Sequence, residues 1–258
     1  MDENKISVVI HTYNEENSLC EILEYVKGFD EILVCDMEST DNTVKIAEDF
    51  GCRVITFPKG NHTIAEPARD FAIHSAKYPW ILTVDADEII PTDLKDFLYQ
   101  YIQNNPSDGL YIPRKNYIMN CFAKNSYPDY QLRFFRKDKA YWPPHVHSKP
   151  QISGNTEKIP SGKTELAMIH KSMSLYTKLH KINIYTQNEV SRRRGAKAGW
   201  LKMIIKPTFR FFQYYFLKGG IFQGITGLVL AVNEANYKFY TLAKIWEHNN
   251  GEKNLGEK

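Results

Sequence analysis

The stretch "WILTVDADEIIP", Trp80–Pro91, carries an apolar run straight into a cluster of three acids. The run "WILTVD" is typical of a buried β-strand, and a proline then opens a helical pattern over Thr92–Ile102. Asp85, Asp87 and Glu88 are therefore expected together at the carboxyl end of a strand. Because neighbouring like charges repel one another, a bound cation or a proton-transfer task must offset the cost. The stretch predicts a functional site at the edge of a sheet.

Three earlier segments repeat this order of strand and helix. The expected strands are "ISVVI" (Ile6–Ile10), "EILVCD" (Glu31–Asp36) and "RVITF" (Arg53–Phe57), and the expected helices are Asn14–Phe29, Thr43–Gly51 and Ile64–Ala76. Such alternation with short links predicts an α/β fold with a mostly parallel central sheet flanked by helices. In these sheets ligands bind at the carboxyl ends of strands. Asp36 and the acids after Val84 both lie at such ends.

The pattern changes after Asp108. The runs "GLYIPRKNYIM" and "YQLRFFRKDKAYW" predict strands of a mixed or antiparallel extension, and residues 172–247 indicate a mostly helical segment with a break at Pro207. The longest apolar run, residues 219–232, is interrupted by glycines and Gln223, and it is shorter than the ~20 apolar residues of a membrane-spanning helix. Four cysteines without a CxxC pair, and an N-terminus without a signal-peptide pattern, fit a reducing cytoplasm.

The acidic triplet favours metal chemistry. Side chains alternate along an extended segment, so Asp85 and Asp87 project to the same side. Two carboxylates so placed can bind a hard divalent cation, Mg²⁺ or Mn²⁺, which keeps open positions for phosphate oxygens. The alternative is a solvated loop at the end of a strand.

Two polar loops follow the first and second expected strands. In "HTYNEE", Tyr13 and Glu15 could hold a nucleoside, and the alternative is that Asn14 caps the following helix. In "CDMESTDNT", Asp36 is the functional candidate, whereas residues 39–41 equally fit turn and helix-cap chemistry.

Four segments together resemble a known enzyme family. "SVVIHTYNEE", "ILVCDMESTDNT", "AEPARDFAI" and "LTVDADE" occur in this order, and they are similar to the motifs of the family 2 nucleotide-sugar glycosyltransferases. The later "DYQLRFFRKDKAYWPPHVHS" and the helical tail resemble a narrower branch, the lipopolysaccharide-core glycosyltransferases. The resemblance implies a GT-A fold, a Rossmann-like α/β domain with a metal-binding DxD motif.

The resemblance also implies roles for individual residues. Those expected to bind the nucleotide-sugar are Thr12, Tyr13, Glu15, Asp36, Arg69 and Asp85. The expected metal ligands are Asp85 and Asp87 of the DxD motif, with Asp87 closest to the metal, and His147. This chain has Asp70 where the family often has Asn, and Ser148 where the branch has Glu. For His147, as for His145, a surface position in a proline-rich loop is the alternative.

Transfer with inversion needs a base that takes a proton from the acceptor hydroxyl as the nucleoside diphosphate leaves. The resemblance implies an Asp after the DxD motif, and Asp129 in "PDYQLR" is the first choice. Arg133 is expected to orient it or to meet a phosphate. Glu88, next to the donor site, is the second choice, and a turn position after Pro128 is the alternative reading of Asp129.

Charge is unevenly distributed along the chain. Between Lys171 and Lys218 there are eleven Lys or Arg residues and one acidic residue, Glu189, which gives this segment a net charge of +10. Because the whole chain has a net charge of +3, the remaining residues carry −7. Six of the eight residues 209–216 are aromatic. A basic, aromatic segment predicts contact with an anionic membrane surface through residues 171–246. The alternative is an aromatic helix packed on the catalytic domain, and nucleic acid is not the expected partner because no recognised binding motif accompanies the charge.

The sequence therefore predicts a GT-A catalytic domain over residues 1–170 and a helical membrane-proximal extension over residues 171–258. Residues 1–105 form the expected nucleotide-sugar half and residues 106–170 the acceptor half. The expected enzyme is cytoplasmic and peripheral to the inner face of the cell membrane. It moves one sugar from a nucleotide donor, with a UDP-sugar expected, to a lipid-linked or lipopolysaccharide-like acceptor; processive members carry a QxxRW-type motif that is absent here. The rivals are a nucleotidyltransferase and a non-catalytic adaptor that retains the fold.

Overall fold

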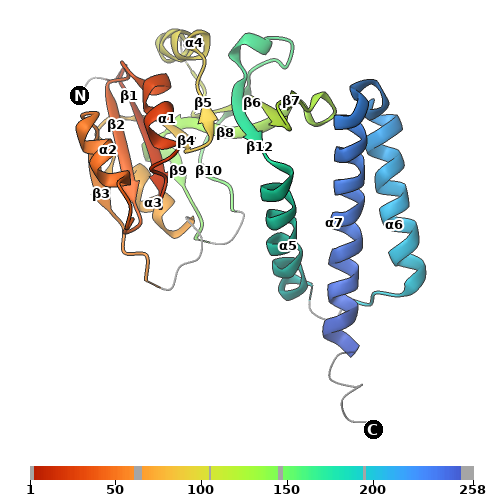
Figure 1. The fold of residues 1–258 in the computed structure, drawn as a ribbon. Coiled ribbons are helices and arrows are strands. Elements are labelled where there is room, and N and C mark those ends of the chain that lie inside the picture. The colour runs from red at the N-terminus through yellow and green to blue at the C-terminus, as the bar shows by residue number, and fades with distance from the viewer. Residues whose placement is uncertain (1–2, 61–65, 105, 145–147, 194–195, 251–258) are drawn as a thin grey trace. The chain divides into compact units, whose positions relative to one another are not determined.

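A computed structural model describes residues 3–60, 66–104, 106–144, 148–193 and 196–250. The chain divides into two compact units (Figure 1). Residues 1–114 and 128–171 form the first, which we call the sheet unit. Residues 115–127 and 172–258 form the second, which we call the helical unit.

A mixed ten-stranded sheet is the main β-structure of the protein. The strands are β1 (Ile6–Thr12), β2 (Glu31–Asp36), β3 (Arg53–Thr56), β4 (Trp80–Asp85), β5 (Glu88–Ile89), β6 (Gly109–Ile118), β7 (Cys121–Phe122), β8 (Asp129–Arg136), β9 (Ala140–Tyr141), β10 (Gln151–Ile152), β11 (Thr156–Lys158) and β12 (Met168–Met173). The sheet order is β3-β2-β1-β4-β8-β6-β12-β5, with β7 and β11 paired to β6, while β9 and β10 form a separate pair. Strands β3 to β4 are parallel, and β8 joins β4 and β6 antiparallel. The predicted parallel sheet with an antiparallel extension is confirmed.

Helices cover both faces of the parallel strands. They are α1 (Leu19–Val26), α2 (Thr43–Asp49), α3 (Glu66–Ser75) and α4 (Thr92–Gln103). Alternate residues of β1 pack to opposite faces, as the period of a strand requires: Val8 joins the cluster that holds α1 and α4, and Val9 joins the cluster that holds α3. Because both faces are covered, β1 is buried along its whole length. This packing fixes the carboxyl ends of β1, β2 and β4 at one edge.

The loop after β1 is longer than the sequence predicted. Helix α1 begins at Leu19, not at Asn14, so the prediction that a helix starts there is wrong, and so is the alternative that Asn14 caps it. Asn14 has a left-handed backbone with φ of 54°, and its side-chain oxygen accepts a hydrogen bond from the Thr40 amide at 2.8 Å. The Asn14 amide in turn donates to Ser39 Oγ at 2.9 Å. Contacts with the loop after β2 therefore hold this segment out of the helix.

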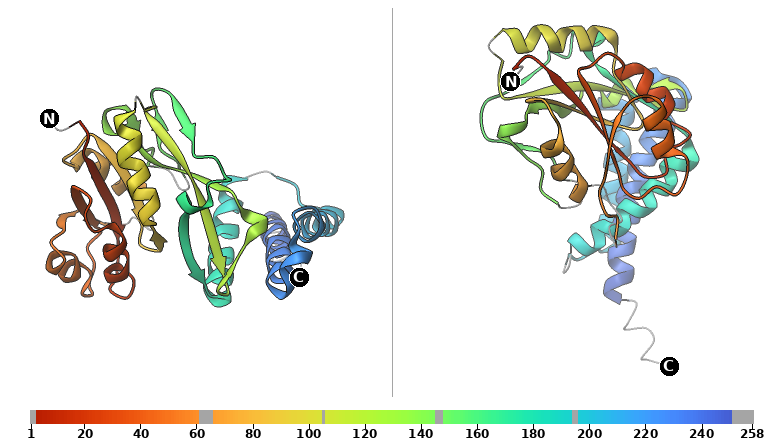
Figure 2. Two further views of the ribbon diagram at one scale, coloured as in Figure 1. Left: turned by 90° about the horizontal axis from the view of Figure 1, so that it is seen from above. Right: turned by 90° about the vertical axis from the view of Figure 1, so that its left-hand side faces the viewer.

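The helical unit contains three long helices, α5 (Leu175–Arg192), α6 (Trp200–Phe212) and α7 (Gly224–Asn250). A π-helical turn over Gln213–Leu217 and a 3₁₀ turn over Gly220–Gln223 join α6 to α7. Helix α7 contacts both α5 and α6, and it lies between them (Figures 1 and 2). The tail is thus helical, as predicted.

Pro207 lies inside α6, so the predicted helix break at this residue is wrong. A proline in a helix interior removes one backbone hydrogen bond at a cost of about 3 kcal/mol. The packing of α6 along α7 offsets that cost, since these two helices share the most extensive contact among the described elements.

The turn between α6 and α7 depends on glycine. A Cβ on Gly227 would lie 1.9 Å from the carbonyl oxygen of Gly220, so only glycine allows the 3₁₀ turn to fold back onto α7. Within the described residues, no single helix is long and apolar enough to cross a membrane. The segments Trp200–Leu217 and Gly220–Asn250, bent by 68° at their junction, reach that length and composition only together.

Candidate active site

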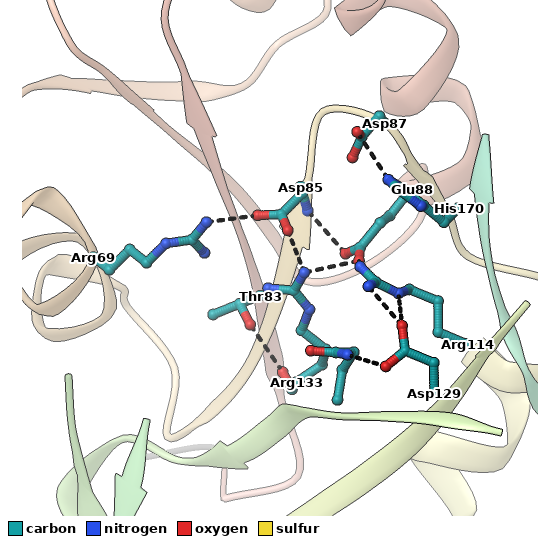
Figure 3. Close-up of polar contacts among 10 residues, drawn as sticks. Arg69, Thr83, Asp85, Asp87, Glu88, Arg114, Asp129, Arg133 and His170 are labelled. Carbon is teal, nitrogen blue, oxygen red and sulfur yellow. Dashed lines mark hydrogen bonds and ion pairs between the residues drawn. The ribbon is translucent and has the colours of Figure 1, made fainter. Parts of the chain in front are cut away.

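Asp85, at the carboxyl end of β4, lies between two arginines (Figure 3). Arg69 on α3 donates from Nη2 to Asp85 Oδ1 at 2.8 Å, and Arg133 on β8 donates from Nη2 to Asp85 Oδ2. Burial alone would raise the pKa of Asp85, but the positive charges of Arg133 and Arg69 outweigh it and hold that pKa well below its usual range. Asp85 is therefore a carboxylate at any physiological pH.

Glu88 is completely buried next to Asp85 and Arg133. Its Oε1 accepts hydrogen bonds from Arg133 Nη2 and from Arg114 Nη1, both at 2.7 Å, and its Oε2 accepts one from the Asp85 amide at 3.1 Å. The side chain has 0% exposure. Glu88 thus closes the turn after β4 and joins the two arginines.

Asp129, at the start of β8, is held by Arg114. The guanidinium donates from Nε and Nη2 to Asp129 Oδ2 at 3.1 and 2.7 Å, and Gln131 donates to Oδ1 at 2.8 Å. The Asp129 side chain keeps 31% exposure, in contrast to the buried Glu88. Arg133, expected to orient Asp129, contacts Asp85 and Glu88 instead. Arg114 takes that place because it faces Asp129 directly in the β6–β8 register.

Asp87 pairs with a histidine that the sequence reasoning missed. His170 Nε2 lies 3.0 Å from Asp87 Oδ2, and β12 places it beside the acidic turn because His170 pairs with Glu88 in the β12–β5 register. Figure 3 shows this contact at the acidic turn. No motif surrounds His170 in the sequence, and 83 positions separate it from Asp87. Only the strand pairing reveals the contact.

A carboxylate oxygen and an imidazole nitrogen so close together are a donor set that suits Mn²⁺ and also admits Mg²⁺. Asp87 keeps 45% exposure, so solvent and phosphate oxygens have access to it. Among the described residues, no three His, Cys, Asp or Glu side chains form a cluster that would hold a metal by themselves. The predicted ligand His147, and its neighbour His145, lie outside the described residues. The residues present therefore fit a cation that shares its coordination with a phosphate ligand.

The predicted nucleoside residues form the edge of the sheet at β1 and β2. Thr12 Oγ1 donates to Asp36 Oδ1 at 3.1 Å, and the Ser39 amide donates to Asp36 Oδ2 at 2.9 Å. Asp36 is only 2% exposed, so its carboxylate organises the two loops. Tyr13 is 40% exposed and its ring lies under Lys59 Nζ at 3.8 Å. The ring is thus partly exposed at the surface, and the Lys59 ammonium covers one of its faces.

Glu15 lies in the same loop. Its carboxylate accepts a hydrogen bond from Ser18 Oγ at 2.5 Å, while its amide donates to Thr43 Oγ1 at 2.7 Å. Asp41 accepts from the Thr43 amide at 3.0 Å, as the turn interpretation of residues 39–41 expects. The N-cap residue of α2 is Asn42, which makes no side-chain cap hydrogen bond. The two loops are therefore joined by hydrogen bonds at several points.

His11 completes the buried polar cluster. It is 7% exposed and lies beside Asp85 in the β1–β4 register. The pKa of His11 is lowered to about 3, first by burial and then by the positive charge of Arg69, whose effect exceeds the opposing effect of the Asp85 carboxylate. His11 is therefore a neutral imidazole in the native protein.

Comparison with known proteins identifies the family of the chain. The model of the family described as glycosyl transferase family 2 matches residues 7–178, more than half of the chain. The chain belongs to that family. The matched segment contains the acidic turn, both arginines that hold it, and the Asp87–His170 pair. The resemblance drawn from the sequence, and the glycosyltransferase activity that it implied, are confirmed.

Relatives align along nearly the whole chain. An uncharacterized glycosyltransferase of Rickettsia conorii is 26% identical over 266 residues, covering 97% of this chain and 93% of that protein. The lipopolysaccharide core biosynthesis glycosyltransferase LpsC of Rhizobium meliloti is 25% identical over 256 residues, covering 94% and 92%.

Solved structures show the same fold. The mannosyltransferase PcManGT from Pyrobaculum calidifontis, in complex with GDP-Man and Mn²⁺, has a TM-score of 0.56 at 14% identity and covers 94% of this chain and 87% of that one. S. aureus TarS 1–349 in complex with UDP-GlcNAc has a TM-score of 0.50 at 15% identity, with 96% and 92% covered. The GT-A fold prediction is confirmed.

Proposed function

We propose that the protein is a metal-dependent, inverting glycosyltransferase that moves one sugar from a nucleotide-sugar to a hydroxyl of a lipid-linked or lipopolysaccharide-like acceptor. The observation that carries the proposal is the acidic turn after β4. There Asp85 is ionised between two arginines, and Asp87 stands beside His170 with its carboxylate exposed. A nucleotidyltransferase is excluded as a rival by the family to which the chain belongs.

The donor is assigned to the edge formed by β1, β2 and β4. In this proposal the base stacks on the exposed ring of Tyr13, and Thr12, Glu15 and Asp36 shape the loops that hold the nucleoside. Arg69 and Asp85 lie next to the sugar-diphosphate. Two structurally similar enzymes bind UDP-GlcNAc or GDP-Man, which supports a nucleotide-sugar donor, and we expect a UDP-sugar.

Asp87 and His170 are the residues that would hold a divalent cation. Asp85, also expected as a ligand, instead accepts hydrogen bonds from Arg69 and Arg133 through its two oxygens. When bound, such a cation neutralises negative charge that develops on the leaving diphosphate. The Mn²⁺ in PcManGT supports this assignment by analogy. The chain's own contribution is to hold the two side chains at the end of β4 and β12, where Asp87 keeps access to solvent.

Asp129 is assigned as the base that takes the acceptor proton. Its carboxylate is partly exposed, whereas Glu88 has no exposed surface and accepts hydrogen bonds from two arginines and one backbone amide. In this mechanism the acceptor oxygen bonds to the anomeric carbon while the bond to the diphosphate breaks, and the hydroxyl proton passes to Asp129. Arg114 holds Asp129 in place through two hydrogen bonds.

The acceptor assignment rests on relatives and on the helical unit. LpsC acts in lipopolysaccharide core biosynthesis, and a diphosphoundecaprenol-directed glucosyltransferase of Escherichia coli is 28% identical over 145 residues. Exposed apolar side chains lie along α6, and this surface suits a peripheral position on the inner face of the cell membrane. An acceptor carried by a lipid would then be presented to the enzyme at that surface.

The donor reaction can be tested without knowing the acceptor. We would incubate the purified protein with a panel of nucleotide-sugars, in Mn²⁺ or in chelator, and measure release of nucleoside diphosphate. The proposal expects metal-dependent release from one donor, at a rate that rises when extracted bacterial glycolipids are added. Failure of every donor to react under either condition would instead favour an adaptor that retains the fold.

A further inference from the structure

The helical unit contains a hollow between α6 and α7 with a volume of about 430 Å³. Its lining combines positive and apolar side chains. The positive ones are Arg193, Lys206, Arg210 and Lys238, and the large apolar ones are Ile205, Phe209 and Leu242. No part of the glycosyl-transfer site uses these residues, since that site lies in the sheet unit.

The positive charge of the hollow is only half neutralised. Arg193 Nε lies 2.6 Å from Glu189 Oε2, and Arg210 Nη2 lies 3.0 Å from Glu234 Oε2. The described part of the chain places no such carboxylate against the ammonium groups of Lys206 and Lys238. Among the described residues, these two ammonium groups therefore have no ion pair of their own.

The pKa of Lys238 is affected by the positive charges around it. Burial lowers the pKa of Lys238, and the nearby guanidinium groups of Arg210 and Arg193 lower it more than the carboxylates of Glu234 and Glu189 raise it. An anion in the hollow would relieve that repulsion. The electrostatics thus favour a ligand that carries negative charge.

The apolar side of the hollow continues onto an exposed surface. Ile205 and Phe209 line it while keeping 55% and 62% exposure. They belong to a stripe on one side of α6, which we call the α6 stripe, that comprises Trp200, Leu201, Ile204, Ile205, Phe209 and Phe212. A ligand that fills the hollow and also covers the stripe must therefore be charged at one end and apolar along its length.

We propose that the hollow is a binding site for the phosphate headgroup of an anionic phospholipid, whose acyl chains lie along the α6 stripe. Lys and Arg donate strong charge-assisted hydrogen bonds to phosphate oxygens. A nucleotide or a nucleic acid would meet the cations but would leave the apolar stripe in water. The inference rests on the membrane-facing role proposed for this unit and adds to it a saturable site for one lipid.

The test uses a monomeric lipid so that attraction to a charged bilayer does not contribute. Dihexanoyl phosphatidic acid, kept below its micelle concentration, is titrated into the full-length protein, and binding is followed by calorimetry. We expect saturable one-to-one binding. Dihexanoyl phosphatidylcholine and inorganic phosphate are titrated in parallel, and the first should bind weakly because its headgroup is neutral overall, the second because it has no acyl chains.

Two charge-matched variants locate the site. Lys206→Gln/Lys238→Gln removes both lysine cations of the hollow, and it should weaken phosphatidic acid binding at least about 20-fold. Lys197→Gln/Lys202→Gln removes two exposed cations of the same unit outside the hollow, and it should weaken binding less than about twofold. Thermal unfolding midpoints of both variants show whether each retains the fold.

Three results would overturn the proposal: no saturable binding to the wild-type protein, equal losses in the two double variants, or inorganic phosphate binding as tightly as phosphatidic acid. Because no donor or acceptor is present, such a result would leave the proposed glycosyl transfer untouched. Conversely, a donor panel without reaction would not affect this measurement.

Discussion

At the scale of single residues, Asp129 and Glu88 are the two candidates for the base, and they differ in burial: Asp129 is partly exposed and Glu88 is fully buried. Asp129→Asn should reduce sugar transfer by at least about 100-fold, because it removes the proton acceptor, while donor affinity remains within about twofold. Glu88→Gln should act mainly on stability. It leaves Arg133 and Arg114 without their shared buried partner, and we expect a loss of about 3 kcal/mol in the free energy of unfolding.

Transfer rate, donor affinity and denaturant unfolding, measured on both variants, check this assignment. Asp138→Asn, on an exposed 3₁₀ turn, serves as the control and should match the wild type. A stable Glu88→Gln protein without transfer, together with an active Asp129→Asn protein, would reverse the two roles.

His11 makes stability depend on pH. The unfolded chain binds a proton near the ordinary pKa of 6.5, but the native state does so only at about 3. The native state is therefore destabilised as pH falls below 6.5, by about 2 kcal/mol on reaching pH 5. Denaturant unfolding at pH 7.5 and pH 5 should show this loss in the wild type and lack it in His11→Asn. The exposed His180→Asn control should keep the wild-type loss, and an equal pH dependence in all three proteins would contradict the prediction.

The sequence revealed the site residues unevenly. Asp85 and Asp87 could be found because a strand pattern ends in them, and strand ends carry function in α/β sheets. Arg114 and His170 could not, because each reaches the acidic turn only through strand pairing across 26 and 83 positions. The pairing of β8 and β12 with their neighbours is a property of the folded sheet, and no local motif encodes it.

At the scale of elements, periodicity predicted most strands and helices well. The buried strands β1, β2 and β4 follow from their apolar runs, and α4 begins after a proline as expected. The two errors, at Asn14 and at Pro207, share a cause. In each, tertiary contacts overrode a local preference: hydrogen bonds between two loops at Asn14, and packing along α7 at Pro207.

The proposed membrane contact of α6 can be tested at the α6 stripe. Replacing Ile204 and Phe209 by Ser removes two exposed apolar side chains, each worth about 1.5–3 kcal/mol of burial in lipid. We therefore expect binding to anionic vesicles to fall at least about 10-fold. Because neither side chain is buried within the protein, the free energy of unfolding should change by less than about 1 kcal/mol. Unchanged vesicle binding in a co-sedimentation assay would show that α6 does not contribute to membrane binding.

At the scale of the whole molecule, net charge is distributed unevenly along the chain. Residues 171–218 carry +10 and the rest of the chain −7. Attraction of a basic surface to anionic lipid weakens within a Debye length, which shortens from about 10 Å at 0.1 M salt to about 3 Å at 1 M. We predict that vesicle binding weakens at least about 10-fold over that range and that high salt releases the bound protein. Retention on the vesicles at 1 M salt would instead indicate insertion of the bent pair formed by α6 and α7.

The central claim is that the acidic turn after β4 cleaves a nucleotide-sugar with a divalent cation held by Asp87 and His170. Titrating Mn²⁺ into a donor-hydrolysis assay tests it most directly. The Mn²⁺ concentration for half-maximal release of nucleoside diphosphate should rise at least about 10-fold in Asp87→Asn and in His170→Ala. It should stay unchanged in the exposed control Asp93→Asn. Release that does not depend on Mn²⁺, or the same half-maximal concentration in all four proteins, would contradict the account.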